Sequence, residues 1–224
     1  MKQSPHPSSI FDPAPDADPE SRILYTAKQR LLVSGLSAFT MDDLADDLGM
    51  SKKTIYAHFP SKESIALAII DRIGRFVSEG RERILSDTTL NCPQKLHAAI
   101  SMVGMVLSKV SPAMLADLKR NAPRVYQKLD DMRRKNIPAL FGRVVRDGIA
   151  EGAIRSDVDP SFAAEFWFQA IRGLIDPDVL ERIGMTPKQA LDSAVSLYFQ
   201  GLLTPRGLEQ YRQHIEATRR ETVV

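Results

Sequence analysis

Apolar residues recur at helical spacing along the chain from Ser21 onward. Ile23, Ala27 and Leu31 form the first such stripe, and later segments repeat the same spacing. No convincing run of alternating β-branched residues interrupts it, so the pattern favours helices over strands. The sequence therefore predicts an all-α fold.

The stretch between residues 40 and 59 contains the sharpest helix boundaries in the chain. Thr40 is placed to cap a helix, with Asp43 three residues on completing a capping box, and this helix ends at Gly49. Ser51 then caps a second short helix, which ends before the next proline. Two short helices joined by a sharp glycine turn have the spacing of a helix-turn-helix, whose second helix enters the major groove of DNA.

The helical spacing divides the second helix of this motif into two faces. Ile55 and Phe59 lie one turn apart and point toward the core, which leaves the opposite face for DNA. Lysine at the helix start reaches guanine or phosphate, and threonine offers a hydroxyl and a methyl group to base edges. Free N–H groups at helix starts also favour anions. The residues expected to contact DNA are Thr40, Met41, Ser51, Lys52, Lys53, Thr54, Tyr56, Ala57, His58 and Lys62.

Several of these residues have a plainer alternative explanation. Tyr56 is as well explained by a place in the core as by a hydroxyl that contacts phosphate, and Phe59 is expected in the core. Lys52 and Lys53 suit any solvated helix face, although their place in this motif favours DNA contact. His58 has no second histidine or cysteine at ligand spacing, so we expect a structural or phosphate-facing role and no metal.

Residues from about Ile23 to Ile65 resemble the DNA-binding domain of the TetR family of transcriptional regulators. The matching residues are Thr40, Asp43, Leu44, Ala45, Gly49, Met50, Ser51, Thr54, Ile55, Tyr56, His58, Phe59, Ser61, Lys62 and Glu63. The resemblance implies an N-terminal three-helix domain that contains the helix-turn-helix, followed by a larger helical bundle for effector binding and dimerisation. It also implies a repressor that a small molecule releases from DNA.

The charges around the motif have opposite signs on its two helices. Many relatives have glycine at the position of Lys53, so the second helix carries an extra positive charge. The first helix is acidic, however, with Asp42, Asp43, Asp46 and Asp47, which we expect to face solvent away from DNA. Asp42 or Asp43 would serve the helix N-terminus. Because the net charge is only +2, affinity for DNA must come from a few placed groups.

The resemblance and the composition together divide the chain into four segments. Residues 1–20 are rich in proline and lack the apolar stretch of a secretory signal, so we expect a disordered leader. Residues 21–66 hold the helix-turn-helix domain and residues 67–204 the effector-binding and dimerisation domain. Residues 205–224 are expected to form a charged tail, either frayed or a short surface helix.

A single helix-turn-helix contacts too few base edges for genomic specificity, because each good contact discriminates by only about 1–3 kcal/mol. We therefore expect double-stranded DNA with a palindromic operator and a homodimer that binds it. The apolar stripes at about 161–175 and 187–203 are wide enough to bury one face within the protomer and another against a twofold mate. By resemblance, they would form a four-helix interface.

Six residues of the larger domain are candidates for the pocket of an unknown effector. They are Met102, Met105, Phe141, Trp167, Phe168 and Arg172. Methionine adapts to irregular shapes and aromatic residues line apolar cavities, but core packing explains the five apolar residues equally well. Arg172 lies one turn from Asp176, so a local ion pair is the alternative to a polar anchor.

The remaining features indicate no enzyme and no second site. No glycine-rich phosphate loop, metal-spaced His or Cys pair, or nucleophile motif is found, so we expect no catalytic residue, metal or cofactor. Cys92 is the single cysteine of the sequence, which excludes an internal disulfide. With no second cysteine to pair with, we do not expect Cys92 to act as a redox sensor. The basic cluster within residues 119–135 is interleaved with aspartates and is interpreted as a solvated helix face.

The chain has no apolar run of about 18 residues, so we expect no membrane partner. The single cysteine fits a reducing compartment, so we expect a cytoplasmic protein. Two alternatives to an effector-controlled repressor stay open. One is an activator, and the other is a helical DNA-binding protein that needs no effector. The sequence does not distinguish them, nor does it identify the effector or the operator.

Overall fold

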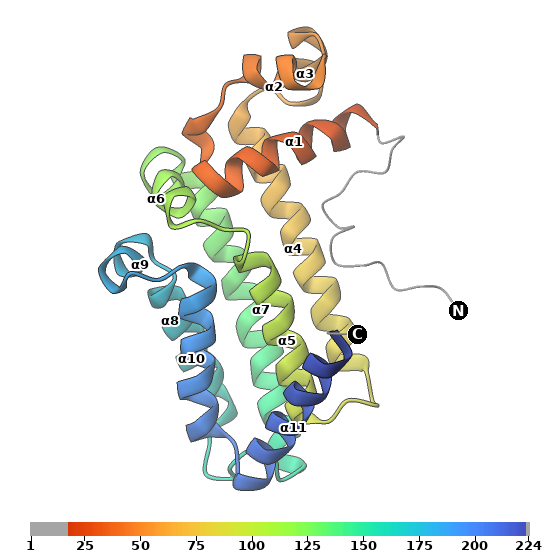
Figure 1. The fold of residues 1–224 in the computed structure, drawn as a ribbon, viewed down its shortest axis with the longest axis vertical. Helices are drawn as coiled ribbons and strands as arrows, with labels where there is room; N and C mark the ends of the chain where they lie inside the picture. The colour runs from red at the N-terminus through yellow and green to blue at the C-terminus, as the bar shows by residue number, and fades with distance from the viewer. Residues whose placement is uncertain (1–17, 223–224) are drawn as a thin grey trace. The chain divides into compact units, whose positions relative to one another are not determined.

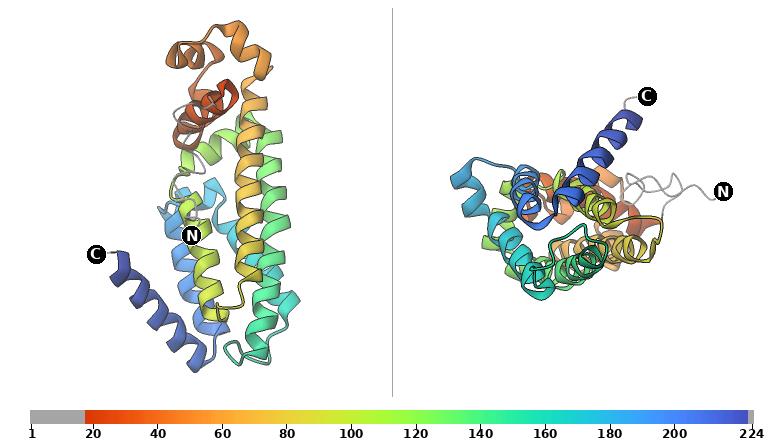
Figure 2. Two further views of the ribbon diagram at one scale, coloured as in Figure 1. Left: turned by 90° about the vertical axis from the view of Figure 1, so that its right-hand side faces the viewer. Right: turned by 90° about the horizontal axis from the view of Figure 1, so that it is seen from below.

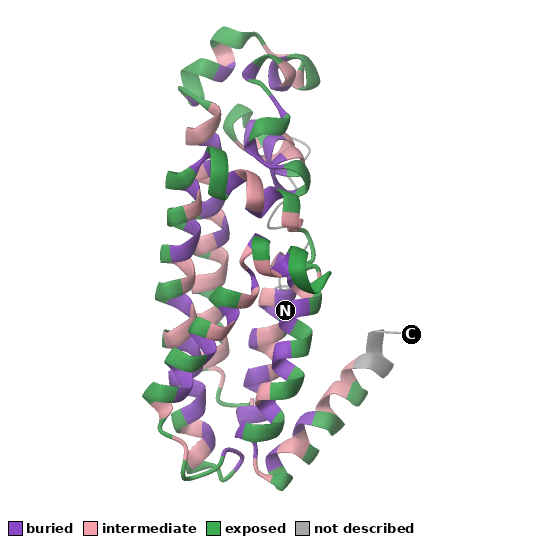
Figure 3. Cartoon of the chain, turned by 90° about the vertical axis from the view of Figure 1, so that its left-hand side faces the viewer, coloured by how far each residue is buried: buried purple, intermediate pink, exposed green. Residues whose placement is uncertain are grey.

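The computed structural model describes residues 18–222, with side chains described up to residue 218. This part of the chain forms eleven α-helices and one 3-10 turn, with an isolated bridge between Ile154 and Leu203 in place of any strand. The predicted all-α fold is confirmed (Figure 1). Buried and exposed residues alternate along the helices at helical spacing (Figure 3).

The described residues form two compact units, and neither of them is continuous in sequence. The first unit combines the chain up to Phe76 with residues Lys109–Leu129. It holds α1 (Pro19–Ser34), η2 (Leu36–Ala38), α2 (Met41–Leu48), α3 (Lys52–His58), α6 (Pro112–Asn121) and the first parts of α4 (Lys62–Ser86) and α7 (Pro123–Ala150).

A small apolar core holds the first unit together. The apolar face of α1 contributes Ile23, Ala27 and Leu31, which are all fully buried as their spacing predicted. Leu44 from α2 and Ile55 from α3 are likewise fully buried. Helices α2 and α3, with eight and seven residues, are too short to be stable alone, so their stability comes from burying their apolar faces.

The second unit consists of residues Val77–Ser108 and the chain from Asp130 onward. It holds the remainders of α4 and α7 together with α5 (Cys92–Leu107), α8 (Pro160–Leu174), α9 (Pro177–Ile183), α10 (Pro187–Leu202) and α11 (Pro205–Thr222). Helix α10 packs against both α5 and α8, and α11 turns back from the end of α10 to pack against α5 (Figures 1 and 2).

Several helix boundaries differ from the sequence prediction. Residues 1–17 of the predicted leader lie outside the described residues, but Pro19 already starts α1, capped by the Asp18 side chain. Pro177 opens a further short helix, α9, behind its cap Asp176, and this helix was not predicted from the sequence. The predicted charged tail is an 18-residue helix, α11, whose apolar face includes the buried Tyr211.

No single described helix is long and apolar enough to cross a membrane. Taken together, α5 and α6 pass the same test of length and composition. Apolar residues of both helices are buried in the fold, including Leu96 of α5 and Met114 and Leu115 of α6.

Candidate nucleic-acid interface

The turn between α2 and α3 has the geometry that the sequence predicted. Gly49 adopts a left-handed conformation with φ of 61°, which suits glycine best, and its N–H donates to the carbonyls of Ala45 and Asp46. Two residues later, the Ser51 side chain accepts a hydrogen bond from the Thr54 N–H at 3.1 Å and caps α3. The two helices pack against each other within the first unit.

Helix α3 buries one face and presents the other to solvent. Ile55 and Phe59 are buried, which confirms their predicted place in the core. Lys52, Lys53 and Ala57 are exposed on the opposite side. A short helix with one apolar face packed and one polar face open is what major-groove recognition requires.

Three further residues of this segment lie at the edge of the open face. Tyr56 and His58 are exposed, so Tyr56 is not a core aromatic. Thr54 is half-buried, and its hydroxyl lies 2.8 Å from the Ser51 hydroxyl. The Thr54 hydroxyl therefore already has a partner within the cap, while its methyl group has no such constraint.

The N-termini of α2 and α4 are both capped by their own side chains. At α2 the capping box is complete: Thr40 Oγ1 accepts from the Asp43 N–H at 3.1 Å, and Asp43 Oδ2 accepts from the Thr40 N–H at 2.7 Å. Hydrogen bonds from the Thr40 backbone N–H and then from the Thr40 side chain lower the pKa of the Asp43 carboxyl, so a carboxylate occupies the helix start at which a phosphate contact was expected. At α4, Ser61 Oγ accepts from the Ser64 N–H at 3.1 Å, and Ser64 Oγ accepts from the Ser61 N–H at 3.2 Å.

Two other predicted DNA contacts have partners inside the protein. The Met41 side chain is buried, so only the backbone of this residue is available at the start of α2. The amine of Lys62 donates to the Phe39 carbonyl at 3.3 Å, next to the cap of α2. Lys62 thus ties the start of α4 to the segment that leads into α2.

In the second unit, four of the six predicted effector-pocket residues pack as core. Phe141 stacks on Trp167 with ring centroids 5.4 Å apart, and Phe168 is buried. Met102 is buried against Gly80, where a Cβ atom would collide with the methionine sulfur. Met105 is only half-buried.

Arg172, the sixth candidate, is exposed. Its Nε donates to Asp130 Oδ1 at 2.9 Å, so its ion pair crosses from α8 to α7 instead of joining Asp176 one turn away. Asp176 caps α9. The lone Cys92 is buried, and burial raises the pKa of its thiol to about 12, which disfavours a reactive thiolate.

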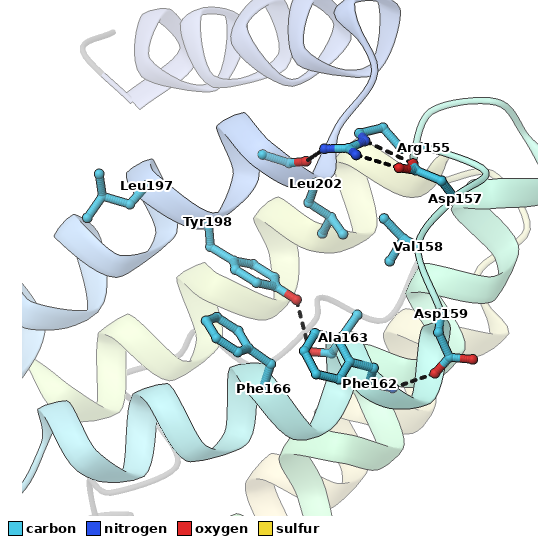
Figure 4. Close-up of a pocket in the computed structure, with 11 residues that line it drawn as sticks. Arg155, Asp157, Val158, Asp159, Phe162, Ala163, Phe166, Leu197, Tyr198 and Leu202 are labelled. Atoms are coloured by element: carbon cyan, nitrogen blue, oxygen red, sulfur yellow. Dashed lines mark hydrogen bonds and ion pairs between the residues drawn. The ribbon is translucent and has the colours of Figure 1, made fainter.

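A hollow of about 540 Å³ lies between the start of α8 and the end of α10 (Figure 4). Its apolar lining includes Phe162, Phe166, Leu197 and Tyr198, and the ion pair of Arg155 with Asp157 stands at one end. None of the six residues proposed from the sequence lines this hollow. Phe162 and Phe166 fall one turn apart on a helix with Trp167 and Phe168 on its buried side, and this excess of aromatic residues was the available signal.

The hollow belongs to a larger apolar surface, which we call the α8–α10 face. It carries the exposed side chains Phe162, Phe166 and Leu197. Phe166 stacks on Tyr198 at 5.5 Å, and the Tyr198 hydroxyl donates to the Ala163 carbonyl at 2.9 Å, so the two helices are held together beneath this face. Large apolar side chains gathered on an exposed face indicate a surface that another molecule covers.

Comparison with known proteins agrees with this geometry. Residues 23–69 match the family described as bacterial regulatory proteins, tetR family. The HTH-type transcriptional regulator YvaF of Bacillus subtilis is 24% identical over 183 residues, which cover 82% of this chain and 95% of that protein. The matched family segment spans α2, α3 and the turn between them.

Solved structures share the fold over most of the chain. A TetR transcriptional regulator from Legionella pneumophila aligns with a TM-score of 0.64 and 15% identity, covering 84% of this chain and all of that one. The regulator FadR from Bacillus subtilis, solved in complex with stearoyl-CoA, aligns with a TM-score of 0.58 and 20% identity, covering 80% and 97%. The chain is a helix-turn-helix transcriptional regulator of the TetR family.

Proposed function

We propose that this protein is a repressor that binds a palindromic operator as a homodimer and leaves it when a small molecule binds. The observation that carries the proposal is the open face of α3, where Lys52, Lys53 and Ala57 are exposed while Ile55 and Phe59 anchor the helix in the core. An anchored helix with a short, solvent-facing polar side is suited to enter the major groove.

The expected contacts divide into those that read bases and those that position the helix. Lys52, Lys53, the Thr54 methyl and Ala57 would face base edges, because they lie on the open side of α3 or at its start. Tyr56 and His58 would reach phosphates, since both are exposed at the edge of that side. The Asp43 carboxylate argues against a direct phosphate contact at the α2 cap.

The α8–α10 face supports the homodimer. Two copies of this face meeting about a twofold axis would give a four-helix interface and remove Phe162, Phe166 and Leu197 from water. Small residues lie beside these side chains on α10: Ser193 and Ser196 are exposed, and a Cβ atom at Gly201 would contact nothing within 4 Å. Small residues let helices approach closely, and side chains from the mate would fill the hollow.

An effector is supported by the neighbouring fold and by adaptable side chains in the second unit. FadR shares this fold and was solved with stearoyl-CoA, a long acyl ligand. In this chain Met102 and Met105 lie on α5, and displacement of such flexible side chains would open room for an apolar ligand. Helices α4 and α7 each have residues in both units. A shift of either helix caused by a ligand in the second unit would therefore be transmitted along that helix to the first unit.

Within the first unit, α6 holds the end of α1. Asp117 Oδ2 accepts from the N–H groups of Leu36 and Ser37 at 2.6 and 3.0 Å, and Ser111 Oγ donates to the Val33 carbonyl. A displaced α6 would therefore pull on the helix that supports α2 and α3. This would alter the separation of the two recognition helices, which has to match about 34–36 Å, one turn of DNA.

The test is selection of binding sites from a random duplex library, followed by titration of the selected site. We expect a palindromic site, weaker binding with a lower salt dependence for Lys53→Ala, and a changed or lost sequence preference for Ala57→Arg. Sequence-indifferent binding would instead favour a structural DNA-binding protein. If neither variant altered binding, α3 would not be the recognition helix.

A further inference from the structure

The two lysines at the start of α3 differ in their surroundings. Lys52 Nζ lies 2.6 Å from Asp42 Oδ2 on α2, and both side chains remain more than half exposed. Among the described residues, no carboxylate lies within ion-pair distance of Lys53. The recognition helix therefore begins with one lysine in an ion pair, Lys52, and one without an ion pair in the described part of the chain, Lys53.

The other acidic residues of α2 have separate roles. Asp43 completes the capping box, and Asp47 pairs with Arg30 of α1 at 2.7 Å. The hydrogen bond and charge of Asp42 raise the pKa of Lys52, and the charge of Asp46 adds to this effect. The sequence left open whether Asp42 caps its helix; the structure places its carboxylate on the lysine of α3 instead.

This arrangement affects the two kinds of DNA complex differently. Sequence-independent binding rests on phosphate contacts and the release of counterions. A lysine already neutralised by a carboxylate adds little to that term, and the carboxylate repels nearby phosphates. In an operator complex, a base contact at Lys52 would offset the cost of leaving Asp42.

We propose that Asp42 is a specificity-determining residue that withholds Lys52 from sequence-independent phosphate contacts. The inference rests on the proposed function, because it assumes that α3 is the recognition helix. It assigns a role in DNA discrimination to an acidic residue through its ion pair with Lys52, without any base contact of its own being required.

The experiment compares Asp42→Asn with Asp47→Asn in the full-length protein. Both variants remove one negative charge from α2 and break one ion pair, but only Asp42→Asn frees a cation on α3. Affinity is measured by fluorescence anisotropy on a random-sequence duplex and on a selected site, over a series of salt concentrations. Circular dichroism confirms that each variant is folded.

We expect Asp42→Asn to tighten binding to the random duplex about two- to fivefold, the range of an exposed ion pair, with a smaller gain on the selected site. The salt dependence on random DNA should steepen by about 0.9 in the log–log slope, one further phosphate contact. Asp47→Asn should produce less than half of the gain, and the gain from Asp42→Asn should disappear in a Lys52→Ala background.

Equal gains for the two aspartate variants, or a gain that persists without Lys52, would overturn the inference and leave the proposed function intact. A loss of affinity in Asp42→Asn would overturn it as well, since Asp42 would then position Lys52 for binding. A wild-type protein that binds neither duplex would refute the proposed function, and this inference with it.

Discussion

Truncation of Leu197 to alanine should weaken the dimer without unfolding the protomer. Leu197 is 78% exposed on the α8–α10 face, alongside Phe162 at 69% and Phe166 at 49%. Together these fractions amount to about two whole apolar side chains per protomer, and burying one such side chain contributes about 1.5–3 kcal/mol. The three residues would therefore contribute about 6–12 kcal/mol to a symmetric dimer, before the entropic cost of association.

The contribution of Leu197 alone follows from the same exposed fraction. Because both copies lose the side chain, Leu197→Ala should cost about 2–4 kcal/mol per dimer, which raises the dimer dissociation constant by about 30- to 1000-fold. Val33→Ala is the matched control, since Val33 is 62% exposed but belongs to α1 of the first unit and not to the α8–α10 face.

Sedimentation velocity over a wide range of protein concentration measures this constant. Wild-type protein and Val33→Ala should remain dimeric at concentrations where Leu197→Ala is monomeric, with the same circular dichroism for all three. An unchanged dissociation constant in Leu197→Ala would show that the dimer uses another surface. A monomeric wild-type protein would refute the reasoning from the exposed side chains altogether.

Three further outcomes test the fold around the site. Gly49→Ala should lower the free energy of unfolding by about 1 kcal/mol, because φ at this turn is positive while its Cβ would meet no atom within 4 Å, and Gly49→Asn should recover part of the loss in denaturant titrations. Asp117→Ala should lower the free energy of unfolding by about 1–3 kcal/mol, because two N–H groups lose their acceptor. Asp117→Asn keeps one oxygen and should lower it by less. Equal losses of unfolding free energy in the two variants would contradict the assigned hydrogen bonds. Burial, then the neighbouring His214, lowers the pKa of His97 below 6.5, so the neutral ring stabilises the fold above that pH and the contribution is lost as the pH falls. His97→Gln should therefore show a smaller drop in melting temperature between about pH 7.5 and pH 5 than the wild type does.

The helix-turn-helix was predictable because its signals act over a few residues. Thr40, Asp43, Gly49 and Ser51 fix two helix ends and the turn between them through local hydrogen bonds and one positive φ, and each of these is visible in the sequence. The division of α3 into a buried and an open face followed from spacing alone. Even here, the structure added that Ser51 also engages the Thr54 hydroxyl.

The features missed from the sequence depend on contacts between distant residues. Helix α6 belongs to the first unit because Asp117 bonds to η2 and Ser111 to the end of α1, both about 80 positions away in sequence. From the sequence, Arg172 could pair with Asp176, four residues on, or with a more distant carboxylate such as Asp130. Only the packing of α8 against α7 brings Asp130 within reach. The hollow beside Tyr198 likewise exists only once α8 and α10 are side by side.

The sparse positive charge on the recognition helix links DNA binding to dimerisation. Of the two lysines that begin α3, Lys52 is paired with Asp42, and Lys53 alone has no carboxylate nearby among the described residues. A recognition helix that begins with a single unpaired lysine gains little from phosphate contacts, so stable binding needs both recognition helices at once. Below the dissociation constant of the dimer, occupancy of the operator should then rise with the square of protein concentration. Leu197→Ala should shift that steep region to higher concentration although no atom of Leu197 belongs to the recognition helix.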